Sequence, residues 1–308
     1  MAGVITSNDI TDWNALTLSK NIKAKTVSCL EVMRAYLDHI EKTNPEVNAI
    51  VALQDHEELL SQAKTKDEEL AGGSYNGWMH GFPHAAKDLA LTLGIKTTLG
   101  SPLLKDYVPD VDQLIIERIK NEGAIIIGKT NVPECGLGCQ TFNSVYGTTS
   151  NPYDQAKTSG GSSGGAAVAL ALNMLPVADG SDFAGSLRNP ASFNNVVGFR
   201  PSMGRVPYFP TNEVWSAPMG TEGPMARNVN DVAMLLSTMA GYDSRYPLSL
   251  KEDPNVFSND LEADFNGTKI GWLGDLGGYL PIETGILEMC EKALKSFEDL
   301  GCHVENAR

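Results

Sequence analysis

The chain has 308 residues, 42% of them hydrophobic, which is enough to bury one large core or two small ones. Thirty glycines and sixteen prolines are near average usage and show no period, so the composition excludes disordered, collagen-like and low-complexity chains. Lys and Arg number 24 against 38 Asp and Glu, which gives a net charge of −14. Because no basic run is present to neutralise phosphates, nucleic acid is not an expected partner.

The cysteines and the N-terminus indicate the compartment. Five cysteines are an odd number, and residues 1–6 lack the basic and apolar regions of a secretion signal. The most apolar stretch, residues 166–178, is too short to span a bilayer and carries Asn173. We therefore expect a reducing, cytoplasmic location without a membrane anchor.

The N-terminal part is predicted to be helical. Ser28 and Glu31 form a capping-box pattern, and apolar residues at helical spacing follow until Asn44 and Pro45 end the helix. Residues 48–53 resemble a strand, and residues 55–70 a second, mostly polar helix.

A helix followed by a buried strand occurs twice. Residues 111–122 have one apolar helical face, Gly123 can cap that helix, and residues 124–127 form a short apolar strand. Later, a strand at 269–273, a helix at 283–300 and a strand at 302–305 repeat the arrangement. This order predicts α/β layers. The chain stops at Arg308, in or just after that last strand, so we expect it to be incomplete.

Two motifs fail on physical grounds. Residues 123–130 fit the phosphate-binding P-loop pattern, but a helix precedes them and three isoleucines lie between the glycines. Isoleucine is stiff and favours an extended strand, so we interpret the segment as a buried strand and rank a nucleotide hydrolase last. Cys135 and Cys139 have no His or Cys pair at ligand spacing, and we interpret them as core or loop thiols.

The segment from 157 to 188 carries the chemistry. Residues 158–165 combine serines with glycines, residues 166–172 are small and apolar, and a second Gly-Ser turn follows at 180–188. A serine becomes a nucleophile only with a base to accept its proton and donors to hold the oxyanion. His84 and Lys87 are both candidate bases, and Lys87 qualifies if burial leaves it neutral. The local sequence leaves both open.

Five ordered blocks resemble the amidase signature family, and agreement runs from about Trp13 to the end of the chain. The blocks are Lys87-Asp88 after Gly81-Phe82-Pro83, residues 160–165, the turn from Asp182 to Arg188, residues 197–206, and residues 223–227. The resemblance implies an α/β/α sandwich with a mixed central β-sheet. It also implies one amidase signature domain over 1–308, with an N-terminal helical segment at about 1–70 and an incomplete C-terminal part.

The resemblance also implies the catalytic roles. Ser186 would be the nucleophile, Ser162 the proton-bridging serine after a cis peptide at Gly161, and Lys87 the neutral base. No cofactor and no metal are implied. The oxyanion would be held by the backbone N–H groups of Phe183, Ala184, Gly185 and Ser186.

Asp182 and Arg188 are expected to brace the turn with an ion pair. Most relatives carry two glycines before the serine, whereas this chain has Ala184 at the first of them, as in a subset resembling the nylon-oligomer cyclic-dimer hydrolases. The N–H survives this replacement and a methyl group is added beside the pocket. We expect an altered substrate shape rather than lost activity.

The expected function is hydrolysis of a linear carboxylic amide through an acyl-serine, giving an acid and ammonia or an amine. One alternative is the glutaminase subunit of a tRNA-dependent amidotransferase. Asn189, where those subunits tend to carry Gln, argues against it. Another alternative is a truncated, inactive binding module.

The expected partner is a small-molecule amide substrate, and a homodimer is one assembly that the sequence allows. The substrate itself is not fixed by the sequence. Four aromatic residues either line an apolar pocket or belong to the core: Tyr146, Phe183, Tyr208 and Trp215.

Overall fold

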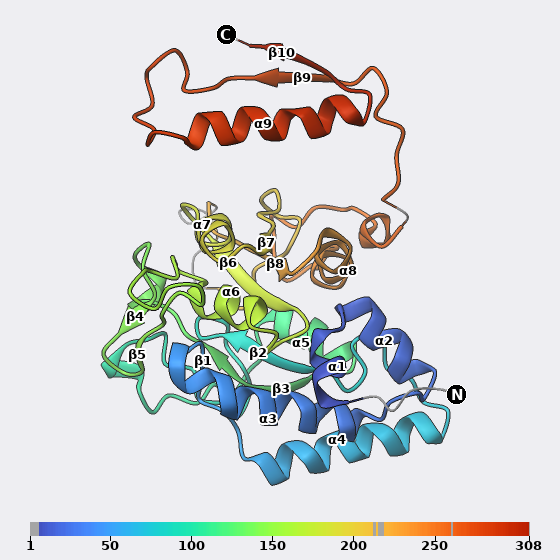
Figure 1. Cartoon of the computed structure of the whole chain (residues 1–308). Helices are drawn as coiled ribbons and strands as arrows, with labels where there is room; N and C mark the ends of the chain where they lie inside the picture. Colours follow the sequence, from blue (N-terminus) through green and yellow to red (C-terminus); the bar gives the residue numbers. More distant parts are fainter. Residues whose placement is uncertain (1–5, 212–213, 215–218, 260, 308) are drawn as a thin grey trace. The chain divides into compact units, whose positions relative to one another are not determined.

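The computed structural model describes residues 6–211, 214, 219–259 and 261–307. The chain separates into two compact units, Met1–Asn259 and Asp260–Arg308, and each is described by itself (Figure 1). A single domain over 1–308 stays a prediction.

The N-terminal segment is helical, as predicted. Ser28 and Glu31 form the capping box: Glu31 N–H donates to Ser28 Oγ at 3.1 Å, and Ser28 N–H donates to Glu31 Oε2 at 2.9 Å. The helix extends past its predicted end, because Pro45 is tolerated in its last turn and Asn48 caps it in the left-handed conformation (φ 52°). The four helices are α1 (Ser7–Asp12), α2 (Ala15–Lys23), α3 (Cys29–Val47) and α4 (His56–Ala71).

The first sheet has the order β1-β3-β2 and is mixed. Its strands are β1 (Ile50–Val51), β3 (Ile125–Thr130) and β2 (Pro83–Lys87). β1 is antiparallel to β3, whereas β2 is parallel to it. The predicted strand at 48–53 is confirmed only over two residues. Helix α5 (Leu114–Asn121) precedes β3, and Gly123 between them has φ 95°, which glycine adopts without strain.

The segment that fits the P-loop pattern is a buried strand, as interpreted from its isoleucines. All six residues of β3 are buried. Lys129 Nζ donates to the Ala90 carbonyl at 2.6 Å and to Thr92 Oγ1 at 2.8 Å, and burial lowers its pKa to about 8. This lysine therefore faces the protein interior rather than a phosphate.

The second sheet has the order β6-β8-β7, in which β8 (Thr221–Ala226) is antiparallel to both β6 (Ala178–Asp182) and β7 (Val197–Gly198). It lies beside the first sheet where β6 meets β2, and the Lys87 N–H of β2 donates to the Asp179 carboxylate of β6. The helices around it are α6 (Gly164–Ala171), α7 (Arg188–Phe193) and α8 (Val229–Met239).

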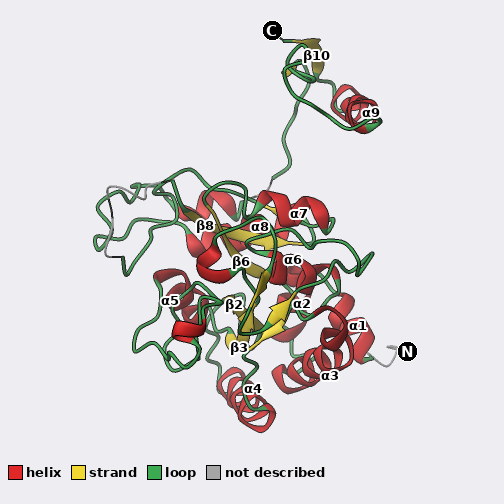
Figure 2. Ribbon diagram, turned by 90° about the vertical axis from the view of Figure 1, so that its left-hand side faces the viewer, coloured by secondary structure: helices red, strands yellow, loops and turns green. Residues whose placement is uncertain are grey.

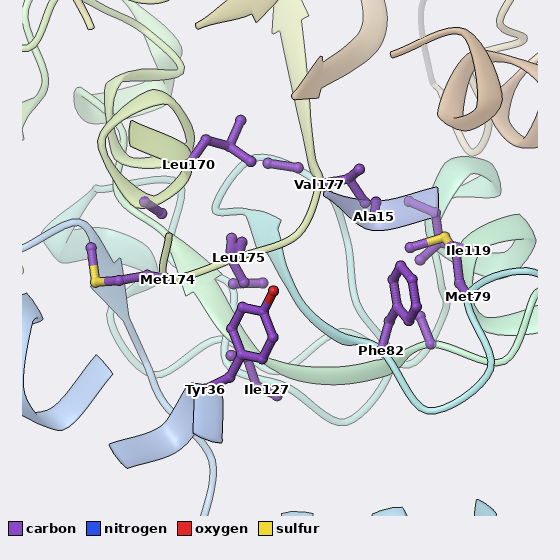
Figure 3. Close-up of a cluster of buried hydrophobic side chains, with 14 of the residues drawn as sticks. Ala15, Tyr36, Met79, Phe82, Ile119, Ile127, Leu170, Met174, Leu175 and Val177 are labelled. Carbon is purple, nitrogen blue, oxygen red and sulfur yellow. The ribbon is translucent and has the colours of Figure 1, made fainter. Parts of the chain in front are cut away.

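Helices cover both faces of the β1-β3-β2 sheet: α3 and α4 lie on one side and α6 on the other (Figures 1 and 2). The mixed α/β fold class predicted from the sequence is thus confirmed. The core between these layers contains Tyr36 from α3, Ile127 from β3 and Leu170 from α6, all fully buried (Figure 3). None of the helices among the described residues is long and apolar enough to cross a membrane.

The C-terminal unit is one β-α-β element. Strands β9 (Lys269–Trp272) and β10 (His303–Asn306) are parallel, and α9 (Ile286–Asp299) connects them. The predicted recurrence of the strand and helix pattern is confirmed. The short remaining elements are β4 (Phe142–Asn143), β5 (Gly147–Thr148), and the 3-10 turns Pro102–Leu104, Glu134–Gly136 and Pro254–Phe257.

Candidate active site

Lys87 is the last residue of β2 and the centre of the candidate site. The residue is 1% exposed, and every other residue of β2 is buried as well. Nζ lies 2.9 Å from Ser162 Oγ, 2.7 Å from Ser163 Oγ and 2.9 Å from Ser181 Oγ. Three hydroxyls therefore surround one amine.

The surroundings of Lys87 favour its neutral form. Burial lowers the pKa of the amine to about 7, although the negative charges of nearby acidic residues oppose this shift. A neutral amine has two hydrogens and one lone pair. It can donate to two of the three hydroxyls and accept from the third, which is the arrangement that a general base needs.

Ser162 and Ser163 stand in the turn that begins α6. The peptide bond between Gly161 and Ser162 is cis, as the resemblance implied. Ser162 is buried, and Ser163 N–H donates to the Ser186 carbonyl at 3.2 Å. This bond joins the two serine-containing turns, which are separated in the sequence by α6 and β6.

Close packing of α6 explains the glycines after these serines. A Cβ at Gly165 would collide with the backbone of Asn131, directly after β3. The small residue therefore lets the helix that follows Ser162 lie against the strand beside Lys87.

The turn of Ser186 is built on Asp182, the last residue of β6. The Asp182 side chain is fully buried. One carboxylate oxygen accepts Gly185 N–H at 2.7 Å and the other accepts Leu187 N–H at 3.1 Å. Arg188 binds the same carboxylate with Nε at 3.0 Å and Nη2 at 3.1 Å. The predicted ion pair is thus present.

The charge of Asp182 is strongly stabilised. Burial raises the pKa of its carboxyl, but the hydrogen bonds from Arg188 and from two backbone N–H groups outweigh burial and hold the pKa at about 2. Arg200 adds a second cation, with Nε 3.2 Å from Asp182 Oδ1. The sequence did not indicate this role, although Arg200 lies in one of the blocks that carry the resemblance.

The backbone of the turn requires one correction to the predicted oxyanion donors. Gly185 has φ 121°, a conformation that favours glycine, and its N–H is already directed at Asp182. It therefore offers no free donor. In the described part of the chain, the N–H groups of Phe183, Ala184 and Ser186 have no hydrogen-bond acceptor, so these three remain candidate oxyanion donors.

Ala184 is accommodated without backbone strain, because its φ is not positive. The turn needs glycine at 185 and accepts a Cβ at 184. Ala184 is exposed and lines the cavity in front of the serines. The methyl group of Ala184 is thus placed where it can change the shape of the substrate pocket, and that change stays a prediction.

One cavity contains the candidate nucleophile. Its volume is about 500 Å³, and both Ser162 and Ser186 line it. Phe183 and Tyr208 also line this cavity, whereas Tyr146 is not among its described lining residues and Trp215 lies outside the described residues.

The two cysteines of the failed metal motif lie at the same cavity. Cys135 and Cys139 are exposed, so they are loop rather than core thiols. Among the described residues, no three His, Cys, Asp or Glu side chains are grouped so that they could hold a metal ion.

The structure separates the two candidate bases. Lys87 contacts Ser162, whereas His84 is fully buried and its Nε2 lies 2.9 Å from Asp179 Oδ1. Lys87 is therefore the base candidate that reaches the serines.

Comparison with known proteins identifies the family. The Amidase family model matches residues 31–308, so the chain belongs to this family. The chain is similar to a glutamyl-tRNA(Gln) amidotransferase subunit from Caldanaerobacter subterraneus subsp. tengcongensis, with 37% identity over 287 residues. That alignment covers 93% of this chain and 58% of the relative.

Solved structures similar to this fold include two amide-cleaving enzymes. A bacterial aryl acylamidase of the amidase signature family has 34% identity and a TM-score of 0.89, over 96% of this chain and 61% of that one. A 6-aminohexanoate cyclic dimer hydrolase in complex with substrate has 27% identity and a TM-score of 0.85, over 97% of this chain and 61% of that one. The chain thus spans about three fifths of the length of these relatives.

Proposed function

We propose that the chain hydrolyses a carboxylic amide through a covalent intermediate on Ser186. The observation that carries this proposal is the 2.9 Å contact between Lys87 Nζ and Ser162 Oγ, in a buried site that favours a neutral amine. Ser186 lines the same cavity as Ser162. Membership of the Amidase family supports the same chemistry.

In the proposed acylation step, Ser186 Oγ attacks the amide carbonyl carbon. Its proton passes to Ser162 Oγ, whose own proton passes to Lys87 Nζ. The N–H groups of Phe183, Ala184 and Ser186 stabilise the resulting oxyanion, and loss of one such donor typically costs about 10²–10³ in rate.

The tetrahedral intermediate collapses when the carbon–nitrogen bond breaks. The proton held by Lys87 returns through Ser162 to the leaving nitrogen, which departs as ammonia or an amine. Water then attacks the acyl-serine with the same base, and the acid is released with Ser186 restored. The proton count at Lys87 is unchanged over one cycle.

The experiment is a hydrolysis assay with matched substrates. The chain is incubated with an anilide, such as 4-nitroacetanilide, and separately with glutamine, and release of arylamine or ammonia is followed. The proposal expects hydrolysis that is absent in Ser186→Ala. Equal release by the wild-type chain and by a folded Ser186→Ala variant would refute it.

A second candidate is the glutaminase subunit of a tRNA-dependent amidotransferase, which would require a partner protein. Its support is the 37% identity to an amidotransferase subunit. Asn189, the residue that argues against this candidate in the sequence, lines the cavity. Ammonia release from glutamine without anilide hydrolysis would favour this candidate. Three expectations from the sequence stay predictions: nucleic acid is not a partner, the chain forms a homodimer, and it is cytoplasmic.

A third candidate is an inactive binding module that keeps the fold. It predicts no hydrolysis of either substrate, and an unreactive Ser186 in a folded chain. A single amidase domain is also a proposal, because this chain covers only about three fifths of the length of its relatives.

A further inference from the structure

A buried group that the proposed mechanism does not use lies directly behind Lys87. Asp179 is in β6, 1% exposed, and it faces β2 of the neighbouring sheet. Its Oδ1 and Oδ2 accept the backbone N–H of Lys87 at 3.2 and 3.1 Å. One side chain thus holds the backbone at the end of the strand that carries the candidate base.

His84 holds Asp179 in turn. The imidazole is fully buried in β2, in the same strand as Lys87, and Nε2 lies 2.9 Å from Asp179 Oδ1. His84 Nδ1 is buried and has no hydrogen-bond partner among the described residues. A neutral imidazole with its hydrogen on Nε2 meets this geometry, because it donates to the carboxylate and leaves only a lone pair on Nδ1.

From this geometry we propose that Asp179 is a positioning residue for Lys87: its carboxylate, held by His84, fixes the backbone at the end of β2 and places a negative charge beside this residue. The proposal rests on the proposed function, in which Lys87 is the base. It adds a role for two buried residues that are not among the lining residues of the cavity.

The other acids near Lys87 do not replace this charge. Asp182 is neutralised by Arg188 and Arg200. Glu222 lies opposite Ser181 in the register of β6 and β8 and is buried, and its Oε2 has no hydrogen-bond partner among the described residues. Burial raises the pKa of its carboxyl well above the usual range. Burial therefore favours the uncharged form of this carboxyl.

Two more charged residues, Lys129 and Asp88, lie close to the end of β2. Lys129 of β3 is buried beside β2, and its amine is bound to Ala90 and Thr92. Asp88, directly after β2, accepts Thr98 N–H at 3.0 Å and the Thr98 hydroxyl at 2.6 Å. The Lys129 amine and the Asp88 carboxylate are thus bound to groups other than Lys87. Asp179 is the acid that binds Lys87 itself, so it is the residue to substitute.

The direction in which Asp179→Asn shifts the pKa of Lys87 follows from two opposing influences on the amine. Burial lowers the pKa of the amine, and the charge of Asp179 raises it. Asp179→Asn removes the charge but keeps an oxygen that can accept the Lys87 N–H. The amine should then lose its proton at lower pH, by about one pH unit, the lower end of the effect of a close opposite charge.

The test measures the ionisation of Lys87 directly and needs no turnover. The chain is labelled with lysine carrying ¹³C at Cε, the Lys87 resonance is assigned with Lys87→Met, and its midpoint is titrated by NMR. The exposed Lys295 serves as the reference. We expect the Lys87 midpoint to fall by about one pH unit in Asp179→Asn. We expect it to stay unchanged in Glu222→Gln, because burial favours the uncharged form of the Glu222 carboxyl.

A Lys87 midpoint that is unchanged in folded Asp179→Asn, or that moves equally in Glu222→Gln, would overturn the proposal. If Asp179→Asn does not fold, Asp179→Ser removes the same charge and keeps an acceptor. Failure of the proposed function is a separate result: it shows as an unreactive Ser186 while the titration of Lys87 still responds to Asp179.

Discussion

The pH dependence of Ser186 reactivity follows from the buried state of Lys87. With a pKa of about 7, about one tenth of the amine is neutral at pH 6 and about nine tenths at pH 8. Since only the neutral amine can take the proton relayed from Ser186, the rate constant for acylation should rise about tenfold between these two values and level off above them.

The assay is the second-order rate constant for labelling of Ser186 by a fluorophosphonate between about pH 5 and 10, followed by intact mass. The matched control is Lys87→Met, which keeps the side-chain length and should lose both the rate and its pH dependence. A wild-type rate that is independent of pH over this range would refute a lysine base. A rate that is still rising steeply at the upper end of this range, as the ordinary lysine pKa of 10.5 would give, would refute the effect of burial.

Other predictions test the remaining parts of the site. Lys87→Ala and Ser186→Ala should each abolish amide hydrolysis while circular dichroism shows an unchanged fold. Because the pKa of Asp182 is depressed to about 2, its charge stabilises the fold above the unfolded value of about 3.9, and this stability is lost as pH falls toward about 2. The difference in urea midpoint between wild type and Asp182→Asn should therefore be largest near neutral pH and vanish below the depressed pKa; a constant difference would contradict this. Gly165→Ala should lower the free energy of unfolding by about 1–3 kcal/mol through overpacking, whereas Gly72→Ala, where a Cβ has room, should not.

Local patterns predicted the elements that local interactions determine. The capping box of Ser28 and Glu31 and the isoleucines of β3 each depend on residues close in sequence, and both predictions are confirmed. Element ends were less accurate, because Pro45 is tolerated near the end of α3 and β1 pairs over only two residues.

The candidate site was predictable where motifs carry it. The resemblance named Lys87, Ser162 and Ser186, and the structure brings Lys87 and Ser162 into contact and places both serines at one cavity. Their catalytic roles stay proposals. Spacing alone could not show which donors are already engaged, and the N–H of Gly185 proved to be directed at Asp182.

Contacts between distant segments could not be predicted from the sequence. Asp179 and Lys87 are 92 residues apart and meet only because β6 lies beside β2. Arg200 reaches Asp182 in the same way, from the segment that follows β7. No periodicity or motif links such pairs, so their roles become visible only in three dimensions.

Formation of a covalent adduct on Ser186 tests the central claim most directly. The chain is incubated with a fluorophosphonate, the intact mass is recorded, and the adduct is located by peptide mapping, with Ser186→Ala as the control. The proposed mechanism predicts one adduct per chain, on Ser186 and absent from the variant. A folded chain without an adduct, or with its adduct on another serine, would contradict it.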